Sequence, residues 1–184
     1  LEGFEAQCAG VLEQAARQRR VGFMVGNRDF LLGDAMLAGC GVIALPDPTL
    51  LARVADSVRG QQELFARTGA VHAAAAFDAQ GGVDVVREDI GRHNAVDKVV
   101  GHLLLARRMP AHGLGLFVSS RASFEMVQKT AAAGIGALAA VSAPTRLAVE
   151  TARSLGVALA GFVRGDDAVA YAFPERFVFP TSLL

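Results

Sequence analysis

The apolar positions of the chain follow two spacings that alternate along the sequence, one typical of helices and the other of strands. Spacing of three or four residues predicts helices over residues 4–20, 49–67, 94–108 and 123–133, with one more starting at Pro144. Short apolar runs predict strands over residues 21–25, 71–77, 83–86, 116–119, 137–141, 157–162 and 168–171. Strands that alternate with helices predict an α/β sandwich with a mixed, largely parallel sheet.

The stretch 27–48 interrupts this alternation with several glycines and prolines, and Cys40 lies inside it between Gly39 and Gly41. Flanking glycines let the backbone turn tightly and leave a thiol unobstructed. A thiol on a mobile, exposed loop can attack the persulfide of a partner and pass on the outer sulfur. The alternative is that Cys40 is a small buried apolar residue. Cys8 falls on an apolar helix face, so we expect it to be structural.

Composition narrows the class of protein. The 184 residues can form one substantial core, and 52% are apolar. Lys plus Arg and Asp plus Glu both total 18, so the sequence shows no basic excess for nucleic acid. No apolar run approaches the roughly 20 residues that span a bilayer. Two cysteines and no signal peptide favour a reducing, cytoplasmic location, although a first residue of Leu1 suggests that the native N-terminus is missing.

Two polar segments each follow a predicted strand and open a predicted helix, where open α/β sheets place ligand sites. In Glu88–Lys98, Arg92 would add charge to helix N–H groups that favour anions. In Ser119–Ser123, three hydroxyls and the Arg121 guanidinium suit a phosphate. Ordinary helix capping, by Asn94 in the first segment, and surface ion pairs are the alternative reading.

The remaining polar positions are less specific. Arg164 lies where a strand enters the turn 161–167 and is suited to a phosphate, with a plain hairpin as the alternative. His72 is expected to be a hydrogen-bonded core residue, and His102 and His112 to lie at the surface. Phosphate-loop, dinucleotide-binding, nucleophile-elbow and zinc-deaminase motifs are all absent, and we expect no metal site.

Several segments, taken in order, resemble one known family. Residues 68–75 read TGAVHAAA, 88–98 read EDIGRHNAVDK, 118–129 read VSSRASFEMVQK and 141–149 read VSAPTRLAV, followed by Gly161–Phe162. On these residues the chain is identified as a member of the formate dehydrogenase accessory sulfurtransferase family, FdhD. The likeness runs from about residue 39 to about residue 176, and the EDIGRHNAVDK segment is highly specific.

The resemblance implies a cytidine-deaminase-like three-layer sandwich without zinc. It implies transfer of sulfur from a cysteine desulfurase to the molybdenum bis(molybdopterin guanine dinucleotide) cofactor of a formate dehydrogenase. Cys40 matches the cysteine that carries the persulfide. The residues that match the family's cofactor-contacting segment are Phe162, Val163, Arg164, Gly165, Asp166 and Asp167. Further candidates for the cofactor are Arg92, His93, Ser120 and Arg121.

The chain departs from the family in two places. Ile43 stands where the family usually has a second loop cysteine, so a relay that uses two thiols is impossible here. The family also has a longer N-terminal region. We therefore expect residues 1–48 to form an N-terminal remnant with the mobile cysteine loop, and residues 49–184 to form the deaminase-like domain.

Two other functions stay open at this stage. One is a chaperone that binds the cofactor while Cys40 is chemically idle, which Ile43 favours. The other is a different enzyme on the same scaffold, with His72 or His93 as a base, which the missing zinc ligands disfavour. A homodimer is also left open.

Overall fold

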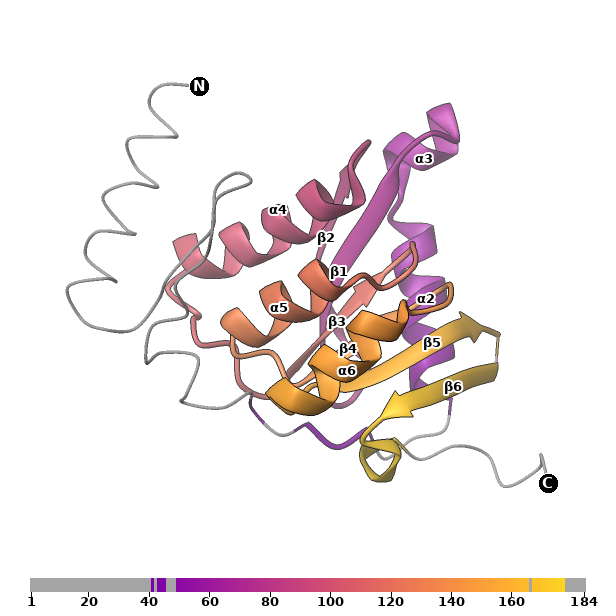
Figure 1. Ribbon diagram of the computed structural model, residues 1–184. Helices are drawn as coiled ribbons and strands as arrows, with labels where there is room; N and C mark the ends of the chain where they lie inside the picture. Colours follow the sequence, from indigo (N-terminus) through magenta and orange to yellow (C-terminus); the bar gives the residue numbers. More distant parts are fainter. Residues whose placement is uncertain (1–40, 42, 46–48, 166, 178–184) are drawn as a thin grey trace.

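The computed structural model describes residues 41, 43–45, 49–165 and 167–177, and these residues form one mixed sheet with helices on both faces (Figure 1). The strands are β1 (His72–Asp78), β2 (Val83–Asp89), β3 (Leu114–Val118), β4 (Ala137–Ala140), β5 (Ala158–Arg164) and β6 (Asp167–Ala172). The helices are α2 (Leu50–Gly60), α3 (Glu63–Thr68), α4 (Arg92–Leu105), α5 (Phe124–Ala132) and α6 (Arg146–Leu155), followed by a 3₁₀ turn, η2 (Pro174–Arg176).

The strand order is β2-β1-β3-β4-β5-β6. β3, β4 and β5 are parallel, whereas β1 is antiparallel to both β2 and β3, and β6 is antiparallel to β5. The mixed sheet is confirmed: β2, β3, β4 and β5 run in one direction, and β1 and β6 run against them. β1–β2 and β5–β6 are hairpins, and a tight turn can join only antiparallel strands.

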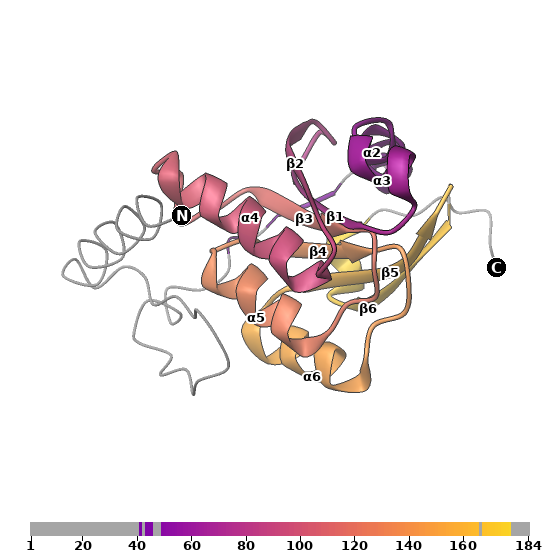
Figure 2. The same cartoon turned by 90° about the horizontal axis from the view of Figure 1, so that it is seen from above.

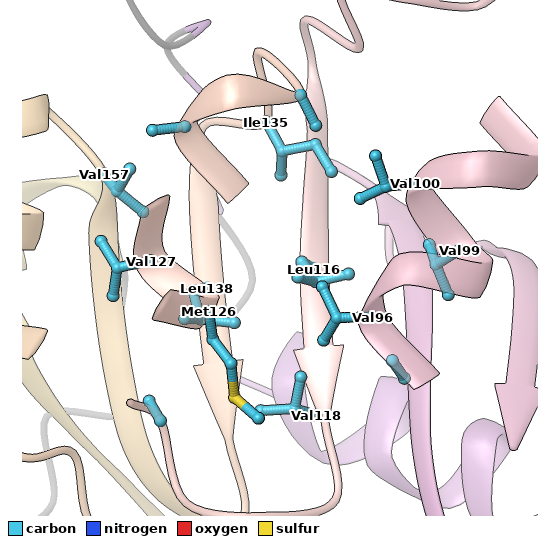
Figure 3. Packing of buried hydrophobic residues seen from close by; sticks show 14 of the residues in the cluster. Val96, Val99, Val100, Leu116, Val118, Met126, Val127, Ile135, Leu138 and Val157 are labelled. Atoms are coloured by element: carbon cyan, nitrogen blue, oxygen red, sulfur yellow. The ribbon is translucent and has the colours of Figure 1, made fainter. Parts of the chain in front are cut away.

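The three-layer arrangement is confirmed. Figure 2 shows α2 and α3 on one face of the sheet and α4, α5 and α6 on the other. The larger core lies under α4, α5 and α6, where the alternate side chains of β3 and β4 meet the valines of α4 (Figure 3). The second core lies under α2 and is built from the opposite side chains of the same strands. No helix among the described residues is long and apolar enough to cross a membrane.

Two predicted helices differ from the observed ones. The helix expected over 49–67 is divided at Gln61 and Gln62, because the Glu88 carboxylate accepts hydrogen bonds from the N–H groups of Leu64 and Phe65 and so starts a new helix there. The helix expected from Pro144 begins at Arg146, because the Thr145 side chain accepts from the N–H of Ala148 and caps it. The elements expected over 4–20 and 21–25 lie outside the described residues.

The segment 43–45 is packed against the domain that follows it. Ile43 and Leu45 are each 2% exposed and belong to the core under α2. The Leu45 N–H donates to the carbonyl oxygen of Arg176, and Leu45 forms a bridge with Phe177. These residues therefore join the α/β unit, on the N-terminal side of the boundary that the sequence places after residue 48.

Candidate functional site

The chain leaves β3, β4 and β5 at one edge of the sheet, and backbone hydrogen bonds hold the three exits side by side. The Ser142 N–H donates to the Ser120 carbonyl oxygen, and the Phe162 N–H donates to the Ser142 carbonyl oxygen, both at 3.4 Å. β2 also ends at this edge, because β2 and β3 flank β1 and run in the same direction. We call this the carboxyl edge. It brings together the candidates from the three segments 88–98, 119–123 and 161–167.

Several polar side chains of the 88–98 segment are used inside the protein. Asp89 accepts hydrogen bonds from the Gly91 N–H and the Asn94 side chain, and its carboxylate lies 2.6 Å from the Lys98 ammonium. The hydrogen bond from Lys98, followed by that from Gly91, holds the pKa of Asp89 below its ordinary value. Asn94 therefore braces Asp89, and the cap position of α4 falls to Gly91. Much of this segment is structural.

His93 is the residue of the segment that contacts the neighbouring loop and the start of α5. The Nε2 atom of His93 lies 2.8 Å from the Glu125 carboxylate and 3.1 Å from the Ser123 hydroxyl oxygen. Burial lowers the pKa of His93; the charge of Glu125 opposes this shift and that of Arg92 adds to it. A neutral imidazole beside a carboxylate carries its hydrogen on the nitrogen that faces it, so Nε2–H is the donor here.

This geometry limits what His93 can do. A nucleophilic triad needs the serine on one ring nitrogen and the carboxylate on the other. Here both Ser123 and Glu125 face Nε2. His93 therefore ties the start of α4 to the start of α5 and cannot activate Ser123 as a base in this arrangement.

In the 119–123 segment, the two serines make hydrogen bonds within the protein, whereas Arg121 is exposed to solvent. The Ser119 hydroxyl accepts a hydrogen bond from the Ala73 N–H and so extends the pairing of β1 with β3. Ser120 is 7% exposed, and its hydroxyl donates to the Arg121 carbonyl oxygen. The Arg121 side chain is exposed at the carboxyl edge. Arg121 is thus free to meet a ligand, whereas Ser120 offers mainly its position in the loop.

Phe162 has a backbone conformation that its side chain disfavours. Its φ is 54°, in the left-handed region, at an irregularity in the pairing of β5 with β6. Such a conformation costs a non-glycine residue about 1–2 kcal/mol. The ring is nevertheless 41% exposed. A strained backbone persists only where the surrounding structure holds it in place. Such residues are concentrated at functional sites.

In the rest of the 162–167 segment, successive side chains of the strand point to opposite faces, so some are buried and others are exposed. Val163 is 2% exposed and belongs to the core under α2, so its side chain faces away from the carboxyl edge. Arg164 and Asp167 are exposed and pair across the hairpin turn through Gly165, whose φ is 53°. Asp166 lies outside the described residues. Phe162, Arg164 and Asp167 are the residues of this segment whose described side chains are exposed.

The sequence analysis did not identify Ser142 as a candidate site residue. Its backbone nevertheless bonds both Ser120, in the loop after β3, and Phe162, near the end of β5. It follows a predicted strand, as Ser119 does, and this position was the available signal. Its carbonyl oxygen lies 3.2 Å from where a Cβ atom of Gly161 would be, and Pro144 Cδ lies 2.9 Å from the same point. Glycine is therefore needed at position 161 for β5 to approach the loop after β4.

Residues near the candidate sulfur position lie at the opposite edge. Cys40 is outside the described residues, but the N–H of Gly41 donates to the Gly134 carbonyl oxygen at 3.1 Å. A Cβ atom on Gly136 would collide with the Gly41 carbonyl oxygen. Gly134 and Gly136 precede β4, and Figure 1 shows residues 43–45 at the bottom of the sheet, away from α3 at the top. Gly41 is thus a residue of close packing.

The separation of the two edges follows from strand length. Gly136 lies before β4 and Ser142 lies just after it. Six residues of extended chain span about 20 Å. The backbone next to Cys40 and the carboxyl edge are therefore separated by roughly that distance.

Comparison with known proteins identifies the family. A model of the FdhD/NarQ family matches residues 36–178. The chain belongs to this family. The sulfur carrier protein FdhD of Bordetella petrii is 62% identical over 120 residues, which cover 65% of this chain and 43% of that protein. The FdhD protein of Bordetella parapertussis is 55% identical over 133 residues, which cover 72% of this chain and 48% of that protein.

The chain therefore spans somewhat under half the length of these curated relatives. Among solved structures, one from Desulfotalea psychrophila, assigned to a formate dehydrogenase accessory protein, matches with a TM-score of 0.69. It is 28% identical, and the match covers 78% of this chain and 61% of that one. A guanine deaminase from Nitrosomonas europaea matches with a TM-score of 0.46 at 15% identity. Within the described part of the chain, no three His, Cys, Asp or Glu residues are grouped as metal ligands would be.

Proposed function

We propose that the chain carries sulfur as a sulfurtransferase. In this proposal Cys40 accepts sulfur from the persulfide of a cysteine desulfurase and passes it to the molybdenum bis(molybdopterin guanine dinucleotide) cofactor required by formate dehydrogenase. The observation that carries the proposal is the family match over residues 36–178, a span that includes Cys40, to relatives named sulfur carrier protein FdhD. Because the chain is shorter than these relatives, their activity and partners are part of the proposal.

The cofactor is the cargo of the reaction, and the carboxyl edge offers groups that suit its guanine nucleotide. Among the described side chains, the Nε atom of Arg92 is buried and lacks a hydrogen-bond partner. A buried donor without a partner costs about 1–3 kcal/mol, and a phosphate oxygen would supply the acceptor. The exposed ring of Phe162 is suited to stack on a base. Arg121 and Arg164 add positive charge at the same edge.

Other charges limit this fit. Glu125 lies against His93, and Asp167 pairs across the hairpin from Arg164, so carboxylates stand beside two of the candidate residues. These carboxylates carry the same sign of charge as a phosphate and repel it, unless they face ribose or base groups of the nucleotide instead. We therefore assign the diphosphate to Arg92 and Arg121, and the base to Phe162 with Arg164 beside it.

The distance between the two edges sets a condition on sulfur delivery. The backbone next to Cys40 and the carboxyl edge are about 20 Å apart by strand length. An extended dinucleotide cofactor bound by its guanine at the carboxyl edge must bring its molybdenum centre toward the opposite edge. Otherwise, Gly41 and Ile43 must leave their packing against Gly134 and Gly136.

A cofactor chaperone without sulfur transfer is the second candidate, and the position of Ile43 favours it. Ile43 is 2% exposed in the core under α2, where a family relay would need its second thiol. Sulfur transfer by this chain therefore rests on Cys40 alone. A role for His93 as the base that activates Ser123 is disfavoured, because the Nε2 atom that faces Ser123 is committed to Glu125.

Uptake of labelled sulfur tests the proposal. The wild type, Cys40→Ser and Cys8→Ser are incubated with a cysteine desulfurase and radiolabelled cysteine. We expect reducible label on the wild type and on Cys8→Ser and none on Cys40→Ser. Equal labelling of both variants would remove Cys40 from its role, and absence of label on the wild type would leave the chaperone reading.

A further inference from the structure

His72 is the first residue of β1, and it lies at the carboxyl edge because β1 runs against β3. It pairs with Asp89 at the end of β2. The imidazole is half-buried, and in the described part of the chain it makes no hydrogen bond or ion pair. The sequence predicts a hydrogen-bonded core histidine at this position. The structure instead leaves both ring nitrogens without a partner among the described residues.

Strand alternation places the His72 side chain on the face of the sheet that α4 covers. Ala74 and Ala76 belong to the core under α4, whereas Ala73 belongs to the core under α2. Side chains two residues apart in a strand share a face. His72 is therefore the next side chain after Ala74 on the α4 side, at the point where the sheet ends.

Arg92 lies on the face of α4 that packs against the sheet, because it comes one turn before the fully buried Val96. Figure 3 shows Val96 beside Leu116 of β3. One helical turn is about 5.4 Å, so Arg92 lies about two strand residues nearer to the carboxyl edge than Leu116. A helical side chain also leans toward the N-terminus of its helix. The Arg92 guanidinium therefore extends toward the level of His72.

Arg92 and His72 are left over when the polar groups around them are paired. In the described part of the chain, the Arg92 side chain has no hydrogen bond or ion pair, and its Nε atom is buried. The neighbouring polar side chains already have partners within the protein, namely His93 with Glu125, Ser119 with the Ala73 N–H, and Ser120 with the Arg121 carbonyl oxygen. A guanidinium and an imidazole thus remain at the same end of the contact between α4 and the sheet.

Asp89 is the carboxylate that pairs across the strands from His72. Its charge is balanced by the Lys98 ammonium at 2.6 Å, and the Gly91 N–H and the Asn94 side chain also donate to it. Asp89 is therefore committed within the protein, and it leaves the space between α4 and the start of β1 to His72 and Arg92.

We infer that His72 and Arg92 hold one phosphate group between them, with Arg92 on the helix side and His72 on the sheet side. The inference rests on the proposed function, because the phosphate is taken to belong to the guanine nucleotide of the cofactor. The guanidinium supplies charge and N–H donors, and an imidazole has an N–H donor in either protonation state. Partial burial strengthens such hydrogen bonds, since less water competes for them.

The alternative is that His72 only completes the packing at the start of β1. Loss of packing would disturb the carboxyl edge as a whole and would weaken GDP and guanosine alike. Loss of a phosphate contact would weaken GDP alone. The comparison of the two ligands therefore separates the roles.

The test is calorimetric titration of the full chain with GDP and with guanosine, for the wild type, His72→Ala, His72→Gln and the control His112→Ala. His112 is a matched control because it is an exposed histidine in the loop before β3, at the opposite edge of the sheet. We expect His72→Ala to weaken GDP binding about 10-fold and to leave guanosine binding unchanged. His72→Gln, which keeps an N–H donor, should stay within about 3-fold of the wild type. The control should match the wild type.

A double-mutant cycle shows whether the two residues hold the same phosphate. In the Arg92→Ala background, His72→Ala should weaken GDP binding by less than about 3-fold, because the phosphate is no longer held against the imidazole. The same loss in both backgrounds would contradict the shared site.

Equal GDP affinity of the wild type and His72→Ala, or an equal loss for GDP and guanosine, would overturn the inference. If His72→Ala fails to fold, the ring-nitrogen NMR signals of His72 in the wild type decide: GDP should shift them and guanosine should not, and no shift with GDP would overturn the inference. The sulfur-uptake experiment fails independently of this one. A wild type that binds GDP through His72 but takes up no sulfur would reject sulfur transfer and keep the phosphate site.

Discussion

The Nε2 atom of His93 lies 2.8 Å from the Glu125 carboxylate, and this contact joins the first turns of α4 and α5. The charge of Glu125 raises the pKa of His93, while burial lowers it further than Glu125 restores. Glu125→Gln should therefore lower the pKa of His93 again. An NMR titration of the His93 ring measures this directly, and an upward movement would contradict the assignment.

The same pKa shift sets the sign of a stability effect. The folded-state pKa of His93 lies below its ordinary value, so the unfolded chain binds the proton more readily. The contribution of His93 to stability is present above a pH of about 6.5 and is lost as the pH falls toward the folded-state pKa. His93→Gln should flatten the stability profile in that window. An unchanged slope in urea titrations at several pH values would refute this expectation.

Glu88 should matter for stability because it starts a helix that buries none of its own residues. Its two carboxylate oxygens accept from the N–H groups of Leu64 and Phe65 at 2.8 and 2.9 Å. Loss of a helix cap costs about 1 kcal/mol. Glu88→Ala should lower the free energy of unfolding by about that amount in urea denaturation. Glu150→Ala, which removes an exposed pair with Arg146, is the control and should cost under about 0.5 kcal/mol.

Ile43→Cys restores the family's second cysteine but places it in the core. Ile43 is 2% exposed, and a shorter side chain there leaves a small cavity that costs on the order of 1–2 kcal/mol. The new thiol should be alkylated slowly in the native protein and rapidly after denaturation, as read by mass spectrometry of peptides. If position 43 were alkylated as fast as Cys40 under native conditions, the packing described for residues 43–45 would not hold in solution.

The carboxyl edge is tested by guanine nucleotides as mimics of half the cofactor. A charge-assisted contact contributes on the order of 1.5–3 kcal/mol, which corresponds to roughly 10- to 150-fold in affinity. Arg92→Ala should weaken GDP binding by that factor in calorimetry and leave guanosine binding unchanged. Arg164→Ala is the comparison. If it weakens GDP selectively while Arg92→Ala does not, the diphosphate lies at the hairpin rather than at the start of α4.

The sequence predicted the helices and strands of the described region to within a few residues, because apolar spacing reports which face each element buries. It could not predict the break between α2 and α3, since the carboxylate that caps α3 comes from Glu88 on another element. It could not predict the left-handed conformation of Phe162, because local preference opposes it and tertiary packing imposes it.

For the candidate site too, the sequence predicted the positions of the segments but not the contacts of their side chains. The polar segments 88–98, 119–123 and 161–167 were identified because each follows a strand, and the parallel strands bring those ends to one edge. The sequence did not show that Asp89 and Asn94 serve the loop itself, because their partners depend on side-chain geometry. Nor did it show that Gly41 packs on Gly134 and Gly136, a contact between distant parts of the chain.

Delivery of sulfur from the loaded chain tests the central claim most directly. Cys8→Ser protein carrying labelled sulfur on Cys40 is separated from the desulfurase and mixed with the guanine-dinucleotide molybdenum cofactor, and with GDP as the control. We predict that the label leaves the protein and appears on the cofactor only in the first mixture. Label that stays on Cys40 in the presence of bound cofactor would contradict the sulfur-carrier account and leave the chain as a binding protein for the cofactor.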